Sequence, residues 1–192
     1  ETADHCVHTL RALEEGCQVF VSKPLSFVSR EVQAIKECAE SKNLLVLPGQ
    51  PLRYEEGILE AAERVRRGEV GEPINIRLFL CHEAMVHQEW ERDPARSGGP
   101  LGTFGVYLFD IVRWVTGQEF VELFAYGDNF VFPQIKAADT VQIGARLASG
   151  ALVQLNLAST MTWPYPFVNL EVIGTEGVLR TNYDNYTVLV QK

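Results

Sequence analysis

The sequence predicts an α/β fold in two parts. A parallel α/β unit is expected over residues 1–72, and an open, mainly antiparallel β-sheet with helices on one face over residues 73–192. Three observations lead to this prediction. Helix and strand patterns alternate in the first third of the chain, the pattern changes at Pro73, and strand patterns linked by tight turns dominate after Gly117. Such alternation is typical of a parallel sheet buried on both faces, and such a run of strands is typical of an antiparallel sheet.

The first part is predicted to contain, in order, helix, strand, helix, strand and helix over residues 4–15, 19–21, 29–41, 44–47 and 54–67. Apolar residues recur at helical spacing in the first helix, and Gly16 supplies its stop. Ser29 is a favourable N-cap for the second helix. Gly68 and Gly71 close the third. The two strands are short apolar runs, each ended by a proline, as expected for strands buried in a parallel sheet.

The second part begins with an alternating strand over 74–81, a polar loop over 83–97 and a helix over 102–116 that ends at Gly117. The rest is predicted to be strand, over residues 120–127, 139–147, 151–159, 166–173, 177–181 and 186–190. Ser149-Gly150 has the composition of a hairpin turn. A sheet built from such hairpins is expected to be mainly antiparallel.

Composition and charge exclude several classes of function. The 192 residues are 46% hydrophobic and 22% charged, which is typical of a globular protein. No apolar run approaches the roughly 20 residues needed to span a bilayer. A net charge of −8 disfavours nucleic acid or an anionic membrane as the main partner and leaves a small molecule as the expected one. The four cysteines form no CxxC pair, which indicates free thiols in a reducing compartment, here expected to be the cytoplasm.

A motif that parallel α/β units often carry is missing. A dinucleotide-binding unit needs a Gly-rich turn after its first strand, where backbone N–H groups hold the pyrophosphate. No G-x-G-x-x-G occurs in the chain, and Gly98-Gly99 does not directly follow a strand pattern. The chain also starts without Met. We therefore expect that a segment precedes Glu1 in a longer parent.

Several stretches resemble the glucose–fructose oxidoreductase / inositol dehydrogenase (Gfo/Idh/MocA) family. His5 followed by residues 12–16 and 19–25 is similar to that family's His…ALEAGKHVxxEKPL segment. Residues 49–54 and 67–73 resemble its G-x-x-x-R-[FY] turn and its linker into the sheet. Later stretches resemble its W…SGG…DxGxHxxDxxRW block and its last strands, at residues 90–114, 139–150 and 172–177. Together these matches cover nearly the whole chain in the family's order.

The resemblance implies a fold, a function and partners. Residues 1–72 would be the C-terminal remnant of a Rossmann-like NAD(P)-binding domain, and residues 73–192 a substrate and oligomerisation domain that is C-terminally incomplete, since the family's chains would continue past Lys192. The intact parent would be an NAD(P)-dependent oxidoreductase acting on a sugar, polyol or related hydroxyl or carbonyl compound, with NAD or NADP as cofactor. The fragment alone would be inactive. The resemblance further implies a homodimer or homotetramer formed through the sheet face, and a cis Lys23–Pro24 peptide.

The resemblance also assigns the two residues expected to be catalytic. Lys23 matches the family's catalytic Lys, whereas Thr103 stands where the family has Asp and Tyr107 where it has His. Hydride transfer from an alcohol needs a group that handles the hydroxyl proton and a donor that polarises the oxygen. A nearby ammonium favours phenolate, so Lys23 and Tyr107 are the predicted pair. Thr103 cannot supply the charge that Asp would, which leaves the catalytic competence open.

Further residues receive roles by position, each with a structural alternative. Substrate binding is expected for Thr103 and Asp110, which share a helical face with Tyr107, and for Arg53 and Trp90. Cofactor binding is expected for His5, Lys23 and Pro24. Alternatively, Lys23-Pro24 only ends a strand, and Tyr107 is a buried aromatic residue with a satisfied hydroxyl. Asp110 would then pair with backbone or Arg113, and Arg53 would be a surface or interdomain charge.

Two predictions complete the reading of the sequence. No metal site is expected, because neither His5 and His8 nor His82 and His87 have a third ligand at a recognisable spacing. The alternative to an enzyme is a non-catalytic oligomerising or binding protein, in which Thr103 reflects lost chemistry.

Overall fold

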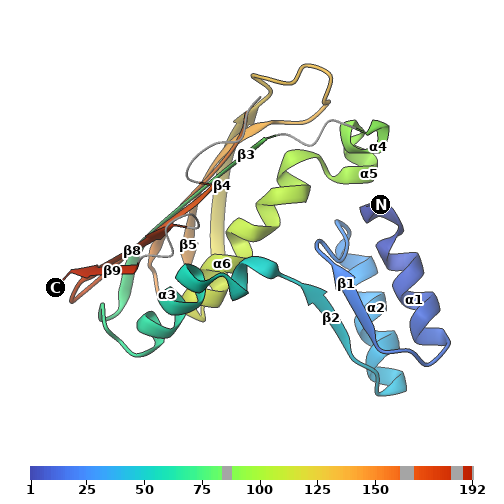
Figure 1. Cartoon of the computed structure of the whole chain (residues 1–192), viewed down its shortest axis with the longest axis horizontal. Helices are drawn as coiled ribbons and strands as arrows, with labels where there is room; N and C mark the ends of the chain where they lie inside the picture. Colours follow the sequence, from blue (N-terminus) through green and yellow to red (C-terminus); the bar gives the residue numbers. More distant parts are fainter. Residues whose placement is uncertain (84–87, 161–166, 183–187, 192) are drawn as a thin grey trace.

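Two β-sheets of different size form the frame of the molecule (Figure 1). The computed structural model describes residues 1–83, 88–160, 167–182 and 188–191. The smaller sheet pairs β1 (Val19–Ser22) with β2 (Val46–Gly49) in parallel. The larger has seven strands in the order β4-β5-β6-β3-β7-β8-β9. The division into a parallel α/β part and a sheet domain is thus present in the fold.

The smaller unit packs two helices on one face of its sheet. After a 3-10 turn, η1 (Thr2–Asp4), come α1 (His5–Glu14) and α2 (Ser29–Lys42). Their buried residues form one core with the inward side of the strands: Cys6, Leu13, Ile35 and Ala39. Phe20 and Leu47, paired in register on the opposite face, are 72% and 55% exposed. One face of this parallel sheet is therefore covered by helices, and the other presents apolar side chains.

The larger sheet is mainly antiparallel, as predicted. Its strands are β3 (Pro73–Glu83), β4 (Phe120–Asp128), β5 (Thr140–Leu147), β6 (Leu152–Thr160), β7 (Val168–Gly174), β8 (Val178–Asn182) and β9 (Val188–Gln191). Among the described strand pairs of this sheet, β3 with β6 is parallel and the others are antiparallel. Because β3 and β6 run in the same direction, their carboxyl ends meet at one edge.

Helices cover one face of the larger sheet, which confirms the predicted architecture (Figure 1). These are α3 (Glu56–Arg66) and α6 (Val106–Thr116). Alternate residues of β3, namely Ile76, Leu78 and Leu80, point into the core beneath them. α3 shares this core, together with residues of η2 (Pro51–Tyr54). Judged by which core its residues share, the smaller unit therefore ends with β2. The predicted domain boundary after residue 72 remains a prediction.

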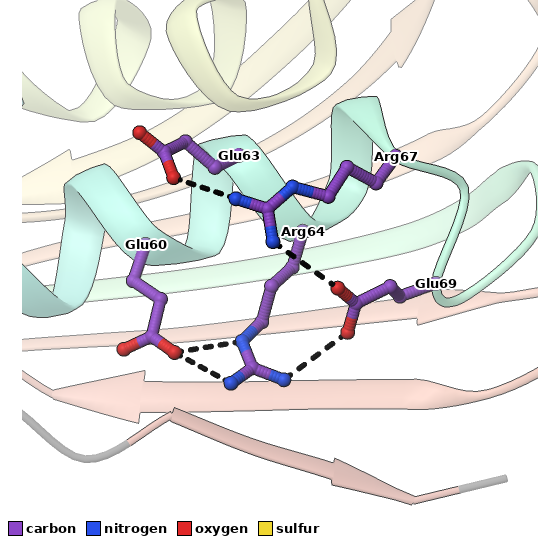
Figure 2. A network of polar contacts seen from close by, with 5 residues as sticks. All are labelled: Glu60, Glu63, Arg64, Arg67 and Glu69. Carbon is purple, nitrogen blue, oxygen red and sulfur yellow. Dashed lines mark hydrogen bonds and ion pairs between the residues drawn. The ribbon is translucent and has the colours of Figure 1, made fainter.

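The C-terminal end of α3 is tied to the turn that follows it by a network of ion pairs (Figure 2). Arg64 bridges Glu60, one helical turn earlier, and Glu69 in the turn. Arg67 contacts Glu63 and Glu69 in the same way. All five side chains are at least partly exposed to solvent, so this network sets the path of the chain into β3 more than it stabilises the fold.

Two segments differ in detail from the prediction. The polar stretch over 83–97, expected to be a loop, contains two one-turn helices, α4 (Glu89–Arg92) and α5 (Pro94–Ser97). Gln88 and Glu91 form a capping box for α4, and Asp93 caps α5. Such short helices are held by their caps and bury little, so they lack the apolar periodicity that identifies a helix in a sequence. The helix predicted over 102–116 begins instead with a π-helical turn, η3 (Leu101–Gly105).

No helix in the described part of the chain is long and apolar enough to cross a membrane. All four cysteines are free thiols, as the sequence predicted.

Candidate active site

A cleft of ≈ 400 Å³ opens where the carboxyl ends of β1 and β2 face α6. Its walls combine apolar and aromatic side chains with a few polar groups: Phe20, Ser22, Lys23, Leu47, Pro48, Gly49, Gln50, Pro51, Tyr54 and Tyr107. Ligands of parallel α/β sheets bind at the carboxyl ends of the strands. The two residues predicted to be catalytic, Lys23 and Tyr107, both line this cleft.

Lys23 directly follows β1, and the next residue, Pro24, is fixed by a contact with His5. The Lys23–Pro24 peptide is cis, which confirms the expectation from the family resemblance. His5 Nδ1 is hydrogen-bonded to the carbonyl oxygen of Pro24 at 2.7 Å. His5 therefore contacts the backbone behind Lys23, and the cofactor role predicted for His5 and Pro24 remains a prediction.

The amine of Lys23 reaches across to the helix layer of the larger sheet. Lys23 Nζ donates a hydrogen bond to the carbonyl oxygen of Thr103 at 2.5 Å. It also lies 4.4 Å from the ring centre of Tyr107 and 5.0 Å from that of Phe104. Burial lowers the pKa of Lys23 from 10.5 to about 8, because a low-dielectric environment disfavours the charged form. Lys23 thus carries an amine that can change protonation state close to neutral pH.

Thr103 contributes to this contact through its main chain. Thr103 lies in the π-helical turn of η3, which precedes α6. Its hydroxyl donates to the carbonyl oxygen of Ser97 at 3.2 Å. The Lys23 ammonium accordingly meets a neutral carbonyl where the family pattern would offer a carboxylate.

Arg53 and Asp110, both predicted to bind substrate, are paired with each other. Arg53 Nε and Nη2 donate to the two carboxylate oxygens of Asp110 at 2.7 and 2.5 Å. The hydrogen bonding of Arg53 to the Asp110 carboxylate is the main cause that raises the pKa of Arg53. The alternative pairing of Asp110 with Arg113 is wrong, because Arg113 binds Glu119. A substrate contact by Arg53 or Asp110 remains a prediction.

His82 is a functional candidate that the sequence analysis considered only as a metal ligand. Its ring stacks on Phe104 with centroids 4.1 Å apart and meets the edge of Phe167 at 5.1 Å. Burial is the main cause that lowers the pKa of His82, and the charge of Lys23 adds to it. Because Ile76, Leu78 and Leu80 face the helices, the two-residue period of β3 places His82 on the same side; that period was the available signal.

Trp90 lies apart from the cleft. Its indole N–H donates to Gln88 Oε1 at 2.7 Å. With Thr103, Phe104 and neighbouring residues it lines a separate cavity of ≈ 20 Å³, about the size of one water molecule. This cavity is too small for a sugar or polyol and gives no support to substrate binding by Trp90, which remains a prediction.

The histidine pairs His5–His8 and His82–His87 were considered as metal ligands in the sequence. Within the described residues, no group of three or more His, Cys, Asp and Glu side chains could hold a metal ion. His87 lies outside the described residues.

Comparison with known proteins identifies the family. A family model described as the GFO/IDH/MocA C-terminal domain matches residues 58–180, more than half of the chain. The chain belongs to the GFO/IDH/MocA family. It is 27% identical over 179 residues to scyllo-inositol 2-dehydrogenase (NAD(+)) of Bacillus subtilis, covering 92% of this chain and 51% of that enzyme. It is also 27% identical over 176 residues to myo-inositol 2-dehydrogenase of Thermotoga maritima, covering 90% and 52%.

Solved structures of this family share the fold. The crystal structure of myo-inositol 2-dehydrogenase from Lactobacillus plantarum superposes with a TM-score of 0.84 at 26% identity, covering 94% of this chain and 55% of that one. The chain thus spans about half the length of the curated relatives it matches.

Proposed function

We propose that the chain is part of a longer NAD(P)-dependent oxidoreductase that transfers hydride between nicotinamide and a sugar, polyol or related hydroxyl or carbonyl compound. The observation that carries the proposal is the meeting of Lys23 Nζ with Tyr107 in one cleft, 4.4 Å from the ring centre. The names of the inositol dehydrogenases it resembles support the substrate class. The four free thiols fit a cytoplasmic location.

The residues of the cleft fit the nicotinamide end of the cofactor. A flat ring is matched by apolar walls that include Phe20, Leu47 and Pro48. Gln50 also lines the cleft, and its buried Oε1 has no hydrogen-bond partner among the described residues. A buried acceptor of this kind calls for a donor, which a carboxamide N–H would supply. No Gly-rich turn is present for the pyrophosphate, so the other half of the cofactor would be bound by a further segment of a longer parent.

The chain's own residues would divide the chemistry between them. The nicotinamide, when bound, accepts or supplies the hydride. One N–H of the Lys23 ammonium is used by Thr103, so two remain to bind and polarise the substrate oxygen. Tyr107 would take the hydroxyl proton during oxidation and return it during reduction. Position 103 holds a Thr and supplies no carboxylate to Lys23, so the Lys23 amine, with a pKa of about 8, would itself titrate near neutral pH.

The test uses the protein encoded by the complete reading frame. We expect Lys23→Met to lower turnover of a polyol such as myo-inositol by about 10²-fold or more, since proton-handling groups contribute on that scale. The variant should still bind NADH or NADPH, and this binding is measured by the fluorescence of the reduced cofactor. Lys36→Met is the matched control, because Lys36 is exposed on α2 and pairs with Glu40. Undiminished turnover in Lys23→Met would remove Lys23 from the mechanism.

A second candidate is a non-catalytic oligomerising protein, favoured by the neutral Thr103 at the site of the family's Asp. In both candidates, we propose that the chain forms a homodimer or homotetramer. The interface would be the bare face of the larger sheet, which is the face opposite α3 and α6 (Figure 1). NAD(P)H binding distinguishes them: the oxidoreductase requires it in the complete protein, and the non-catalytic alternative predicts none.

A further inference from the structure

We propose that Arg53 and Asp110 are positioning residues whose ion pair keeps the Lys23 amine enclosed between the two units of the molecule. The inference rests on the proposed function, since it assigns a pair of residues that prepares the same catalytic amine. Neither side chain lines the cleft.

The pair joins the two walls of the cleft. Arg53 belongs to η2, two residues after the cleft residue Pro51, and Asp110 lies on α6, one helical turn after Tyr107. Both oxygens of Asp110 accept from the Arg53 guanidinium, and the Asp110 side chain is only 10% exposed. A two-point, charge-assisted contact of this geometry fixes orientation as well as distance.

An aromatic residue strengthens the same contact. The guanidinium carbon of Arg53 lies 4.7 Å from the ring centre of Trp114, and that of Arg66 lies at the same distance. Trp114 is on α6, one turn beyond Asp110, whereas Arg66 is at the end of α3. The stacking therefore holds Arg53 in position over α6 from a second side.

Lys23 is tied to Arg53 by the smaller sheet. β1 and β2 are paired up to Ser22 and Gly49, so the residues that follow each strand, Lys23 and then the Gln50–Arg53 segment, move together. The groups that contact the Lys23 amine include Thr103 and Phe104 of η3 and Tyr107 of α6. Enclosure of the amine thus depends on how η2, the segment that follows β2, is held against α6; the ion pair does this together with the buried Leu52 of the same segment.

Other contacts between the units lie where η1 meets α5 (Pro94–Ser97). Glu1 is paired with Arg96, and the ring of Phe27 occupies the space next to Gly98 and Gly102. If the Arg53–Asp110 pair is broken, the cleft is expected to open about these contacts and admit water to the amine. Hydration favours the ammonium, so the pKa of Lys23 would rise from about 8 toward 10.5.

The test measures the Lys23 amine directly and needs neither cofactor nor substrate. The chain has five lysines, and loss of one signal in Lys23→Met identifies Lys23 in the NMR spectrum of lysine labelled with ¹³C at Cε. In Asp110→Asn we expect the pKa of Lys23 to rise by about one unit or more. Titrations of His82 on β3 and Tyr107 on α6, which face the amine, are followed in the same samples.

The matched control is Glu119→Gln, which breaks the equally two-pointed pair of Glu119 with Arg113 in the last turn of α6. Its Lys23 pKa should equal that of the wild type. If Asp110→Asn does not fold by circular dichroism, Arg53→Lys decides, because it keeps the charge and loses the second contact. A folded variant with an unchanged Lys23 pKa would overturn the proposal. Failure of the complete protein to bind NAD(P)H would instead refute the oxidoreductase and leave the pKa result as it stands.

Discussion

Lys23 combines a positive charge with an environment that disfavours it. Its amine is largely enclosed, and its hydrogen-bond acceptor is the uncharged Thr103 carbonyl. The rings of Tyr107 and Phe104 attract a cation, but this attraction compensates only part of the lost hydration. A lysine responds to such a site by lowering its pKa, whereas an arginine would keep its charge. The residue type therefore suits a group that exchanges a proton.

Replacing Lys23 by Met is expected to stabilise the fold at pH 7. The folded pKa is about 8 and the unfolded value 10.5, so between these values the unfolded chain binds more protons and the stability of the wild type rises with pH. Below pH 8 the wild type bears the full penalty, at most about 3 kcal/mol, and above about pH 10.5 it bears none. Urea unfolding at pH 7, 9 and 10.5 should show the advantage of the variant shrinking with pH. A difference that does not change with pH would contradict this account, and Lys36→Met provides the control.

The sequence could identify Lys23, because a strand end followed by Lys-Pro belongs to a recognisable segment. It could also place Tyr107 on the helix that faces it. The partner of Arg53 was out of reach, since that residue lies 57 positions from Asp110 along the chain. The contact between Lys23 and the main-chain carbonyl of Thr103 was also out of reach, because the sequence analysis considered only the Thr103 side chain.

A buried carboxylate organises the segment between β4 and β5. Asp139 is fully buried and accepts hydrogen bonds from the backbone N–H groups of Phe130, Val131 and Phe132 and from the hydroxyl of Thr140. Burial alone would raise the pKa of Asp139, but these hydrogen bonds outweigh burial and lower it. The carboxylate thus replaces the backbone pairing that a turn of this length lacks.

We expect Asp139→Asn to destabilise the protein by about 1–3 kcal/mol, the usual cost of removing hydrogen bonds to a buried charged group. Because the folded pKa is lowered, the contribution of Asp139 is present above the unfolded pKa and is lost as pH falls through the folded pKa. The difference between the wild type and the variant should therefore be larger at pH 7 than at pH 3 in urea unfolding. Asp128→Asn, at the exposed neighbouring position, is the control, and equal losses in both variants would argue against a special role of Asp139.

At the level of elements, the sequence predicted the long helices and the strands, because each has an apolar face with the period of its structure. It missed α4 and α5, whose stability comes from the caps at Gln88 and Asp93. It also missed the π-helical turn of η3. Phe27 closely approaches Gly98 and Gly102, which shows that tertiary packing shapes this segment. A local pattern carries no record of a neighbour more than 70 residues away.

The arrangement of the whole molecule was accessible only in part. The hairpin turns indicated antiparallel neighbours, but the place of β3 between β6 and β7 joins strands separated by 68 or more residues. The meeting of the β1–β2 unit with α6 also depends on contacts such as Lys23 with Thr103, 80 residues apart. Long-range packing of this kind has no local signature. The family resemblance supplied what the residue pattern did not.

The bare face of the larger sheet leads to a prediction about assembly. Among the described residues, helices cover the opposite face only (Figure 1). On the bare side, Arg77 and Arg180 both pair with Glu171, and Phe79 and Leu152 are 37% and 48% exposed. A surface that mixes apolar side chains with charges of both signs can pair with a copy of itself about a two-fold axis.

We expect the chain to form at least a dimer through this face, detectable as a doubled mass by size-exclusion chromatography with light scattering. Phe79→Glu places a carboxylate on the central strand of this face. In a dimer this carboxylate would be desolvated and would lie near the same charge of the second copy, so the variant should be a monomer. Val7→Glu is the matched control, because Val7 is an equally apolar residue, 65% exposed, on α1 of the smaller unit. A monomeric wild type would exclude the dimer at the concentration used. A dimer that survives Phe79→Glu but not Val7→Glu would move the interface to the smaller unit, where Phe20 and Leu47 present the other apolar face.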